Sequence, residues 1–405
     1  MCKAWQLIFS CFSLCALVKR CLKYLREHIG ITLPYIEKIT KYNEKKYLQW
    51  EDVNSCDFPT CLQAKKIAKC FRIPFAGLYM NAKDIKLQHI PKMYNMRTIR
   101  GNGTFDDSSL NLAIMDLLYS RELLISTKNE LQESLSTFSF SIVGTDVKQW
   151  ADSIREIFKL ELKDQYMLPS KRKFYLYIRN KIEKQGVFIQ GFSGVDTEIA
   201  RGVAIYNDLY PIIGINNDDR YPAKTFSIIH ELVHIFKRQS TMCNDMVTSF
   251  SAQQEEVFCN AVAGEVLVPE QAIKTLVRNH KIKDFTEDNI ASLADVFCVS
   301  KEVISRRLLD IGKISQTEYD TFILEFKRTF DMEKEIEREK RKASGNNGFR
   351  NITRETIDKT SGSLFQTLYR GYGEGLVDRQ DIARYLRIDQ KHISNILREV
   401  SQWSN

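Results

Sequence analysis

Apolar residues recur every three to four positions along most of this 405-residue chain, which is the spacing of one face of an α-helix. A different pattern, the short β-branched run at 210–216, predicts a buried strand, and a new helical run opens at Thr225. The spacing predicts helices at 18–26, 110–124, 147–162, 255–269, 293–308 and 381–400. We therefore expect an α+β fold that is mostly helical, with a small sheet packed on the helix that follows Thr225.

The most informative local motif is His230-Glu-Leu-Val-His234, which lies within this expected helix. A helix advances about 100° per residue, so His230 and His234 lie one turn apart on the same face and can share one zinc ion. Glu231 then has the place of the general base of zinc proteases rather than that of a ligand. Five residues alone also match helix surfaces by chance, so the flanking sequence has to support this interpretation.

The helix predicted after the motif supplies further candidates for a metal site. Zinc bound by two histidines needs a third protein ligand and an open position for water. Glu256 and Asn260 are four residues apart and share one helical face, where the amide is placed to orient a ligating imidazole. The strand before the motif and the helix after it place the motif on a helix beside a sheet.

The stretch from about Lys171 to Leu309 resembles the ImmA/IrrE family of zinc metallopeptidases. The matching landmarks are Arg201-Gly202, Ile213-Gly-Ile-Asn216, Phe226–His234, Glu256-Val-Phe-Cys-Asn260, Leu267-Val-Pro269 and Ala294–Ser300. The resemblance implies a zincin-like helix carrying the motif, a Zn²⁺ cofactor and peptide-bond hydrolysis. It implies His230, His234 and Glu256 as the metal ligands and Glu231 as the catalytic base.

Other acids remain open as the third ligand. Glu255 is the rival of Glu256, because a slip of one residue at the helix start would exchange the two. Asp245 and Glu265 are weaker candidates, and for both the alternative is a solvated surface position. We interpret Cys259 as a small packed residue, since thiolate ligation there would displace an acid that is already well placed.

The first part of the chain resembles a Cro/repressor-type helix-turn-helix domain. Gly30 and Thr32 supply a helix stop and an N-cap, and Pro34 suits the first turn of the next helix. The further landmarks are Trp50-Glu51, Phe58-Pro-Thr60 and Leu62–Pro74. One position departs from the family, because Glu37 stands where its second helix has a small packing residue.

The presumed reading helix, near 43–49, carries the candidate nucleic-acid contacts. Lys45 and Lys46 suit phosphates, whereas Gln49 and Asn43 suit base edges. A solvated helix face would have the same composition, and a degenerate helical domain that docks a protein partner is the alternative. Four later side chains are expected to face solvent: Arg306, Arg307, Lys391 and His392.

Composition is that of an ordinary soluble enzyme with more than one core. The net charge of +8 is modest for this length and does not identify a nucleic-acid binder. The ten cysteines form no CxxC pair, which favours free thiols in a reducing cytoplasm. The apolar stretch 4–18 is shorter than the roughly 20 residues of a membrane span and has no signal-peptide cleavage site. It is an apolar first helix, an interfacial anchor or sequence upstream of the true start, and we expect no firm membrane partner.

These observations predict a zinc endopeptidase behind a repressor-like domain. The predicted segments are an apolar extension at 1–17, a helix-turn-helix-like domain at 18–84, a helical connector at 85–170, a zinc metallopeptidase domain at 171–330, a charged helix and hinge at 331–348, and a C-terminal helical region at 349–405. The resemblance implies a protein substrate, either a DNA-bound repressor or an antitoxin, cut in a stress, phage or mobile-element response. The alternative is a DNA-binding, antitoxin-like regulator whose zinc site is structural or vestigial.

Overall fold

The computed structural model describes residues 17–81, 84–85, 94–95, 108–243, 250–343 and 351–401, so most of the predicted extension at 1–17 lies outside them. The chain forms two compact units, one comprising Met1–Lys92 and Ile99–Tyr119, the other Met93–Thr98 and Ser120–Asn405. The helix α5 (Ser108–Glu130) contributes residues to both units, and the segment predicted as a connector is divided between them. No helix among the described residues is long and apolar enough to cross a membrane.

The smaller unit is a helical bundle. After a helix at 17–29 come α2 (Leu33–Thr40), α3 (Glu44–Glu51), α4 (Cys61–Cys70) and the 3₁₀ turn η1 (Phe75–Tyr79). The predicted start of α2 is confirmed, because the Thr32 side chain accepts a hydrogen bond from the Tyr35 amide and Pro34 lies in the first turn. Ile36, Tyr47 and Trp50 meet in its core.

Two glutamates, one on α2 and one on α3, differ in their exposure and in their hydrogen-bond partners. Glu51 is buried and accepts two hydrogen bonds from Arg26, at 2.7 and 2.8 Å, which ties α3 to the first helix. Glu37, which the family pattern placed at a packing position, is exposed, and its carboxylate accepts a hydrogen bond from the Glu44 amide. The departure from the family pattern at Glu37 therefore does not bury a charged group, since the side chain points to solvent.

The larger unit contains a five-stranded mixed sheet in the order β1-β5-β3-β4-β2. The strands are β1 (Tyr94–Asn95), β2 (Phe188–Phe192), β3 (Gly202–Ile205), β4 (Ile212–Asn216) and β5 (Thr241–Cys243). β2 runs parallel to β4, and β3 runs antiparallel to both β4 and β5. Every residue of β2, β3 and β4 is buried, which explains why the run at 210–216 is continuously apolar rather than alternating.

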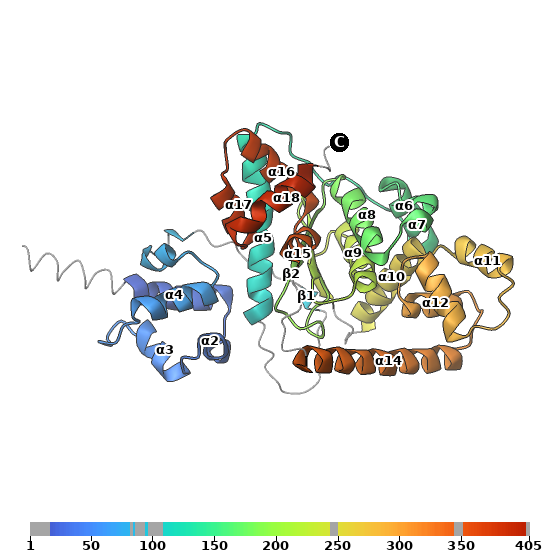
Figure 1. Cartoon of the computed structure of the whole chain (residues 1–405), viewed down its shortest axis with the longest axis horizontal. Helices are drawn as coiled ribbons and strands as arrows, with labels where there is room; N and C mark the ends of the chain where they lie inside the picture. The colour runs from blue at the N-terminus through green and yellow to red at the C-terminus, as the bar shows by residue number, and fades with distance from the viewer. Residues whose placement is uncertain are drawn as a thin grey trace, which may run out of the picture. The chain divides into compact units, whose positions relative to one another are not determined.

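Helices surround this sheet and make up most of the unit, so the predicted mostly helical α+β fold is confirmed. The first of these helices in chain order are α6 (Val147–Ile157), α7 (Leu162–Met167), α8 (Lys171–Glu183), α9 (Tyr221–Phe236), α10 (Phe250–Leu267), α11 (Glu270–Asn279), α12 (Glu287–Val296) and α13 (Lys301–Asp310). After them come the long α14 (Gln316–Ala343), then α15 (Ile352–Lys359), α16 (Gly362–Gly373), α17 (Arg379–Leu386), η3 (Gln390–His392) and α18 (Ile393–Ser401) (Figure 1).

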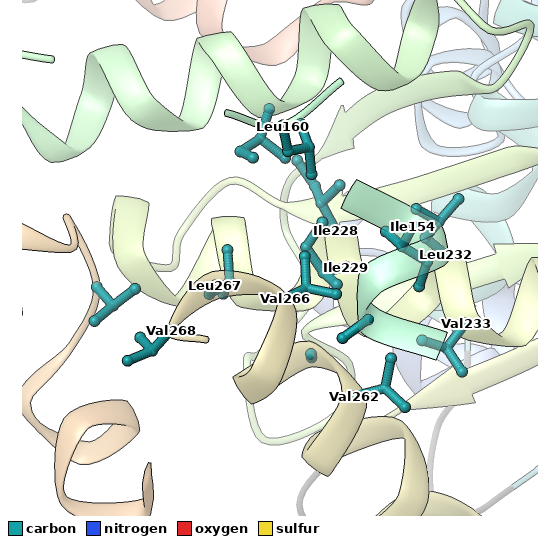
Figure 2. Packing of buried hydrophobic residues seen from close by; sticks show 14 of the residues in the cluster. Ile154, Leu160, Ile228, Ile229, Leu232, Val233, Val262, Val266, Leu267 and Val268 are labelled. Atoms are coloured by element: carbon teal, nitrogen blue, oxygen red, sulfur yellow. The ribbon is translucent and has the colours of Figure 1, made fainter. Parts of the chain in front are cut away.

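The motif helix α9 lies at the centre of the main core. It packs against α8, α10, β3 and β4, and all of its residues from Ser227 to Phe236 are buried. Figure 2 shows Ile228, Ile229 and Leu232 of α9 meeting side chains of α6 and α10. Each fully buried aliphatic side chain of this kind stabilises the fold by about 1.5–3 kcal/mol. A helix held on all sides is a rigid support for functional side chains.

Candidate metal centre and active site

Three buried side chains converge where α9 meets α10. The Nε2 atoms of His230 and His234 are 3.3 Å apart, and they lie 3.1 and 3.2 Å from the two carboxylate oxygens of Glu256. The three residues are 5, 0 and 5 % exposed. All three potential ligand atoms lie within 4.8 Å of one another, and the described parts of the chain contain no second such group.

The electrostatics of this cluster suit a bound cation. Burial alone would raise the pKa of Glu256, but its hydrogen bonds and charge interactions with His230 and His234 outweigh burial and hold that pKa well below the usual range. The carboxylate is therefore ionised. Two imidazole nitrogens and one carboxylate, all aimed at one point, are a donor set that zinc accepts while keeping a fourth position open.

The imidazole of His234 is oriented by a residue that the sequence did not single out. Its Nδ1 lies 3.3 Å from the side-chain oxygen of Gln239 and 3.9 Å from the sulfur of Cys259. A proton on Nδ1 donated to Gln239 would leave the lone pair of Nε2 available to a metal ion in place of the contact with Glu256. Gln239 follows the end of α9 in a loop, where no helical periodicity marks it. Cys259 is buried, as predicted, and burial raises the pKa of its thiol, so it stays neutral.

The outer-sphere role predicted for Asn260 is wrong. Its side chain is exposed on the cavity wall, and within the described structure it makes no hydrogen bond to either imidazole. Although the two residues lie one turn apart on α10, Glu256 is buried and Asn260 is exposed.

Glu231 lies beside the cluster, only 1 % exposed, in contact with the sheet. An added Cβ at Gly202 on β3 would stand 2.3 Å from Glu231 Oε1 and 2.8 Å from its Cγ. The carboxylate therefore occupies space that only a glycine leaves open. Gly202 belongs to the Arg201-Gly202 landmark, and the tertiary fold explains why a glycine stands there.

A cavity of about 330 Å³ opens onto this site. Its wall includes His230, Glu231 and Glu256, together with residues of α13 and Tyr319 of α14. A cavity of this volume admits part of a polypeptide, and charged and polar side chains make up most of its lining. A substrate bond placed there would lie against His230, Glu231 and Glu256.

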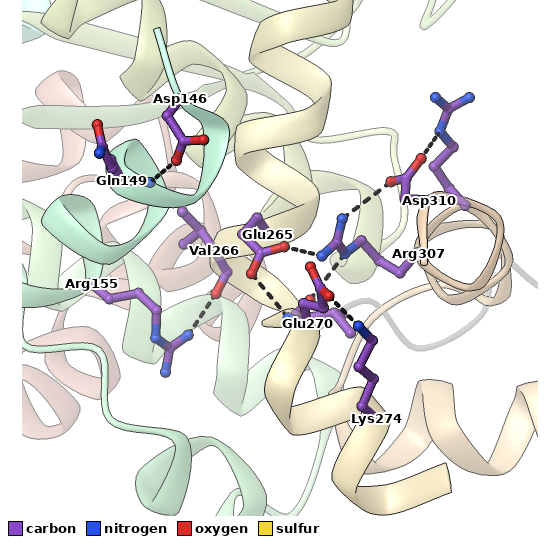
Figure 3. Close-up of polar contacts among 11 residues, drawn as sticks. Asp146, Gln149, Arg155, Glu265, Val266, Glu270, Lys274, Arg307 and Asp310 are labelled. Atoms are coloured by element: carbon purple, nitrogen blue, oxygen red, sulfur yellow. Dashed lines mark hydrogen bonds and ion pairs between the residues drawn. The ribbon is translucent and has the colours of Figure 1, made fainter. Parts of the chain in front are cut away.

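The rival acids have other partners. Glu255 is half-buried and bonds Lys237 at 2.9 Å, away from the histidines. Asp245 lies outside the described residues. Glu265 is buried and forms an ion pair with Arg307, and its other oxygen accepts the Glu270 amide at 2.9 Å (Figure 3).

Glu265 is therefore not a solvated surface residue, and the expectation that Arg307 faces solvent is wrong. The Arg307 guanidinium also donates to the Val268 carbonyl at 3.1 Å and to Asp310 at 3.2 Å, so its buried charge is compensated. Arg306 and Lys391 are exposed, as predicted, and His392 is half-buried.

The candidate nucleic-acid contacts on α3 are only partly available. Lys45 and Gln49 are exposed one turn apart. Lys46 instead donates to Asp57 at 2.7 Å, and Asn43 is the N-cap of α3, where its side chain accepts the Lys46 amide. The side chain of Asn43 therefore caps α3 and is not available for the base contact that the family pattern predicts.

Neither a curated protein nor a solved structure matches this chain. Residues 183–309, which run from the end of α8 to the end of α13, match the Peptidase M78 family model, described as the IrrE N-terminal-like domain. The matched segment contains His230, Glu231, His234 and Glu256. It therefore supports the resemblance to the ImmA/IrrE family and identifies this part of the chain as a metallopeptidase-like domain.

Proposed function

We propose that this protein is a zinc-dependent endopeptidase in which His230, His234 and Glu256 hold Zn²⁺ and Glu231 is the general base. The observation that carries the proposal is the convergence of two buried imidazoles and an ionised carboxylate beside a cavity that Glu231 also lines. Bound zinc would supply Lewis-acid chemistry, which polarises a scissile carbonyl and acidifies water.

The chain's own residues account for the rest of the chemistry. Glu231 accepts a proton from the attacking water and returns it to the leaving amine. Gly202 leaves the space that this carboxylate needs, and Gln239 fixes the orientation of His234. The packed core around α9 keeps these groups in one geometry, because few of its side chains have room to move.

The substrate we propose is a regulatory protein, either a DNA-bound repressor or an antitoxin. The match to the IrrE N-terminal-like domain supports a peptidase, and the ImmA/IrrE resemblance supports this class of substrate. New protein N-termini in cells carrying the active protein, compared with cells carrying Glu231→Gln, would identify it.

DNA binding through the smaller unit is the second candidate function. Residues 17–81 hold twelve lysines and arginines against six acidic residues, and Lys45 and Gln49 are exposed on α3. In this alternative the chain is an antitoxin-like regulator, and the metal site stabilises the fold.

Zinc content and cleavage, measured on the same variants, distinguish the endopeptidase from the DNA-binding regulator. We expect about one zinc per chain, retained in Glu231→Gln while cleavage falls roughly 10²-fold or more, because only the base is lost. Glu256→Gln should lose most of the zinc, whereas Glu255→Gln, its sequence neighbour paired with Lys237, is the matched control and should keep it. Full zinc in Glu256→Gln would refute the ligand assignment. Equal cleavage by Glu231→Gln and the parent protein would favour the regulator.

A further inference from the structure

The end of the chain contains a compact three-helix arrangement formed by α16, α17 and α18, which cluster together in Figure 1. Asp378 caps α17, its side chain accepting the Asp381 amide at 2.7 Å. α17 ends at Arg387, whose φ of 55° is left-handed, and a turn of three residues leads through η3 into α18. Two helices joined by a turn of this length are the geometry of a helix-turn-helix.

The smaller unit contains the same arrangement with the same spacing. There Thr32 caps α2, which ends at Lys41 with a left-handed φ of 63°, and a three-residue turn leads into α3. The caps Thr32 and Asp378 are separated by the same number of residues as the left-handed Lys41 and Arg387. The helix at 17–29 precedes the first motif as α16 precedes the second.

Burial agrees at most of the core positions of the two motifs, although few residues are identical. The first helices bury equivalent sets, namely Val18, Cys21, Leu22 and Leu25 in one and Leu364, Thr367, Leu368 and Gly371 in the other. The helix-turn-helix cores also correspond: Ile36, Tyr47 and Trp50 match Ile382, Ile393 and Ile396. The counterpart of the exposed Glu37 is the buried Ala383, the small residue that a packed second helix favours.

The second helix of the C-terminal motif presents one polar face to solvent. Its start and its outer side expose Lys391, Ser394, Asn395, Arg398 and Glu399, and the first four are spaced as one helical stripe opposite the buried Ile393, Ile396 and Val400. Arginine and asparagine make two-point hydrogen bonds to guanine and adenine edges, and lysine and serine suit phosphates. The corresponding positions in the smaller unit are Lys45, Leu48, Gln49 and Asp52, which include an apolar and an acidic side chain.

The same surface is poor in the groups that anchor a protein partner. Between Asp378 and Ser401, all of which the structure describes, no large apolar side chain is exposed. Protein interfaces rely on buried aromatic and aliphatic anchors at their centre. Residues 378–401 also hold five lysines and arginines against four acidic residues, and Arg379 lies exposed at the start of α17. The surface is therefore better suited to a polyanion than to an apolar partner.

We propose that α17 and α18 form a second helix-turn-helix, which binds duplex DNA with α18 in the major groove. Asn395 and Arg398 read base edges, and Arg379 and Lys391 contact phosphates, with Lys391 leaving the exposed ion pair that it forms with Asp389. Asn395 accepts a hydrogen bond from Arg398 at 3.0 Å, so the two reading side chains already lie side by side. This function is separate from peptide hydrolysis and requires neither zinc nor Glu231.

The test uses the full chain and a pool of DNA duplexes with a randomised centre. We expect enrichment of a preferred sequence, with affinity falling steeply as salt rises because bound phosphates release counterions. Asn395→Ala combined with Arg398→Ala should weaken binding to the enriched duplex by about ten-fold or more. Arg328→Ala, which removes an exposed arginine from α14, is the matched control and should leave binding unchanged. Lys45→Ala with Gln49→Ala tests the N-terminal motif in parallel.

Three outcomes would overturn the proposal: no sequence is enriched, only the Lys45 and Gln49 variant loses binding, or the C-terminal surface captures a protein in place of DNA. A folding defect is separable, because the altered residues are exposed and the melting temperature should not change. Base preference gives a second readout. Arg398→Ala should relax selection at one base pair, whereas Lys391→Ala should weaken binding to all sequences alike.

Discussion

Gly202→Ala tests whether the carboxylate of Glu231 depends on the space above β3. The added Cβ would stand 2.3 Å from Glu231 Oε1, whereas ordinary contacts begin near 3.4 Å. Glu231 must therefore retreat by about 1 Å, a displacement of a reacting group that can cost roughly 10²-fold in rate, or about 2.7 kcal/mol of transition-state stabilisation. Gly202 does not have a positive φ, so alanine introduces no backbone strain that would lower stability.

Zinc content and cleavage rate, measured together, decide this prediction. We expect Gly202→Ala to keep its zinc, because the clash is with Glu231 and not with His230, His234 or Glu256. Gly373→Ala on α16 is the control, since its added Cβ would meet nothing within 4 Å. Unchanged cleavage in Gly202→Ala would refute the argument. Loss of zinc would also refute it, because the substitution would then act on the ligands and not on the base.

Two predictions concern stability. Glu183 is buried where α8 meets the start of α16, and burial raises its pKa to about 7 despite the opposing effects of Arg179 and Ser361. Because the folded pKa exceeds the unfolded value near 4.5, the stabilisation from this group is complete below about pH 4.5 and is lost as pH rises through about 7, by up to about 3 kcal/mol. Thermal unfolding across this range should vary less in Glu183→Gln, and identical pH profiles would contradict the assignment. Arg307→Leu should destabilise the protein by about 3–5 kcal/mol, since it leaves Glu265 charged and buried, and adding Glu265→Leu should recover much of the loss; equal melting temperatures for the single and double variants would argue against a coupled pair.

Local periodicity was sufficient to predict the parts of the site that lie on one helix. The four-residue spacing of His230 and His234 determines that they share a face wherever the helix packs, so this pair followed from the sequence. The N-cap at Thr32 and the first-turn Pro34 were equally local. Helix ends and turns depend on neighbouring residues, which the sequence displays directly.

The remaining features depend on how distant segments pack, which periodicity does not reveal. The choice between Glu256 and Glu255 rests on the rotation of α10 against α9, and the glycine at 202 matters only because β3 runs beneath Glu231. From the sequence alone, Arg307 and Glu265 are indistinguishable from surface charges. In the folded protein both are buried and form an ion pair with each other. The correspondence of the two proposed helix-turn-helix motifs could not be predicted for the same reason. Burial and left-handed turns repeat in them, while apolar residues of different shapes fill equivalent positions, because a core requires volume and hydrophobicity more than particular side chains.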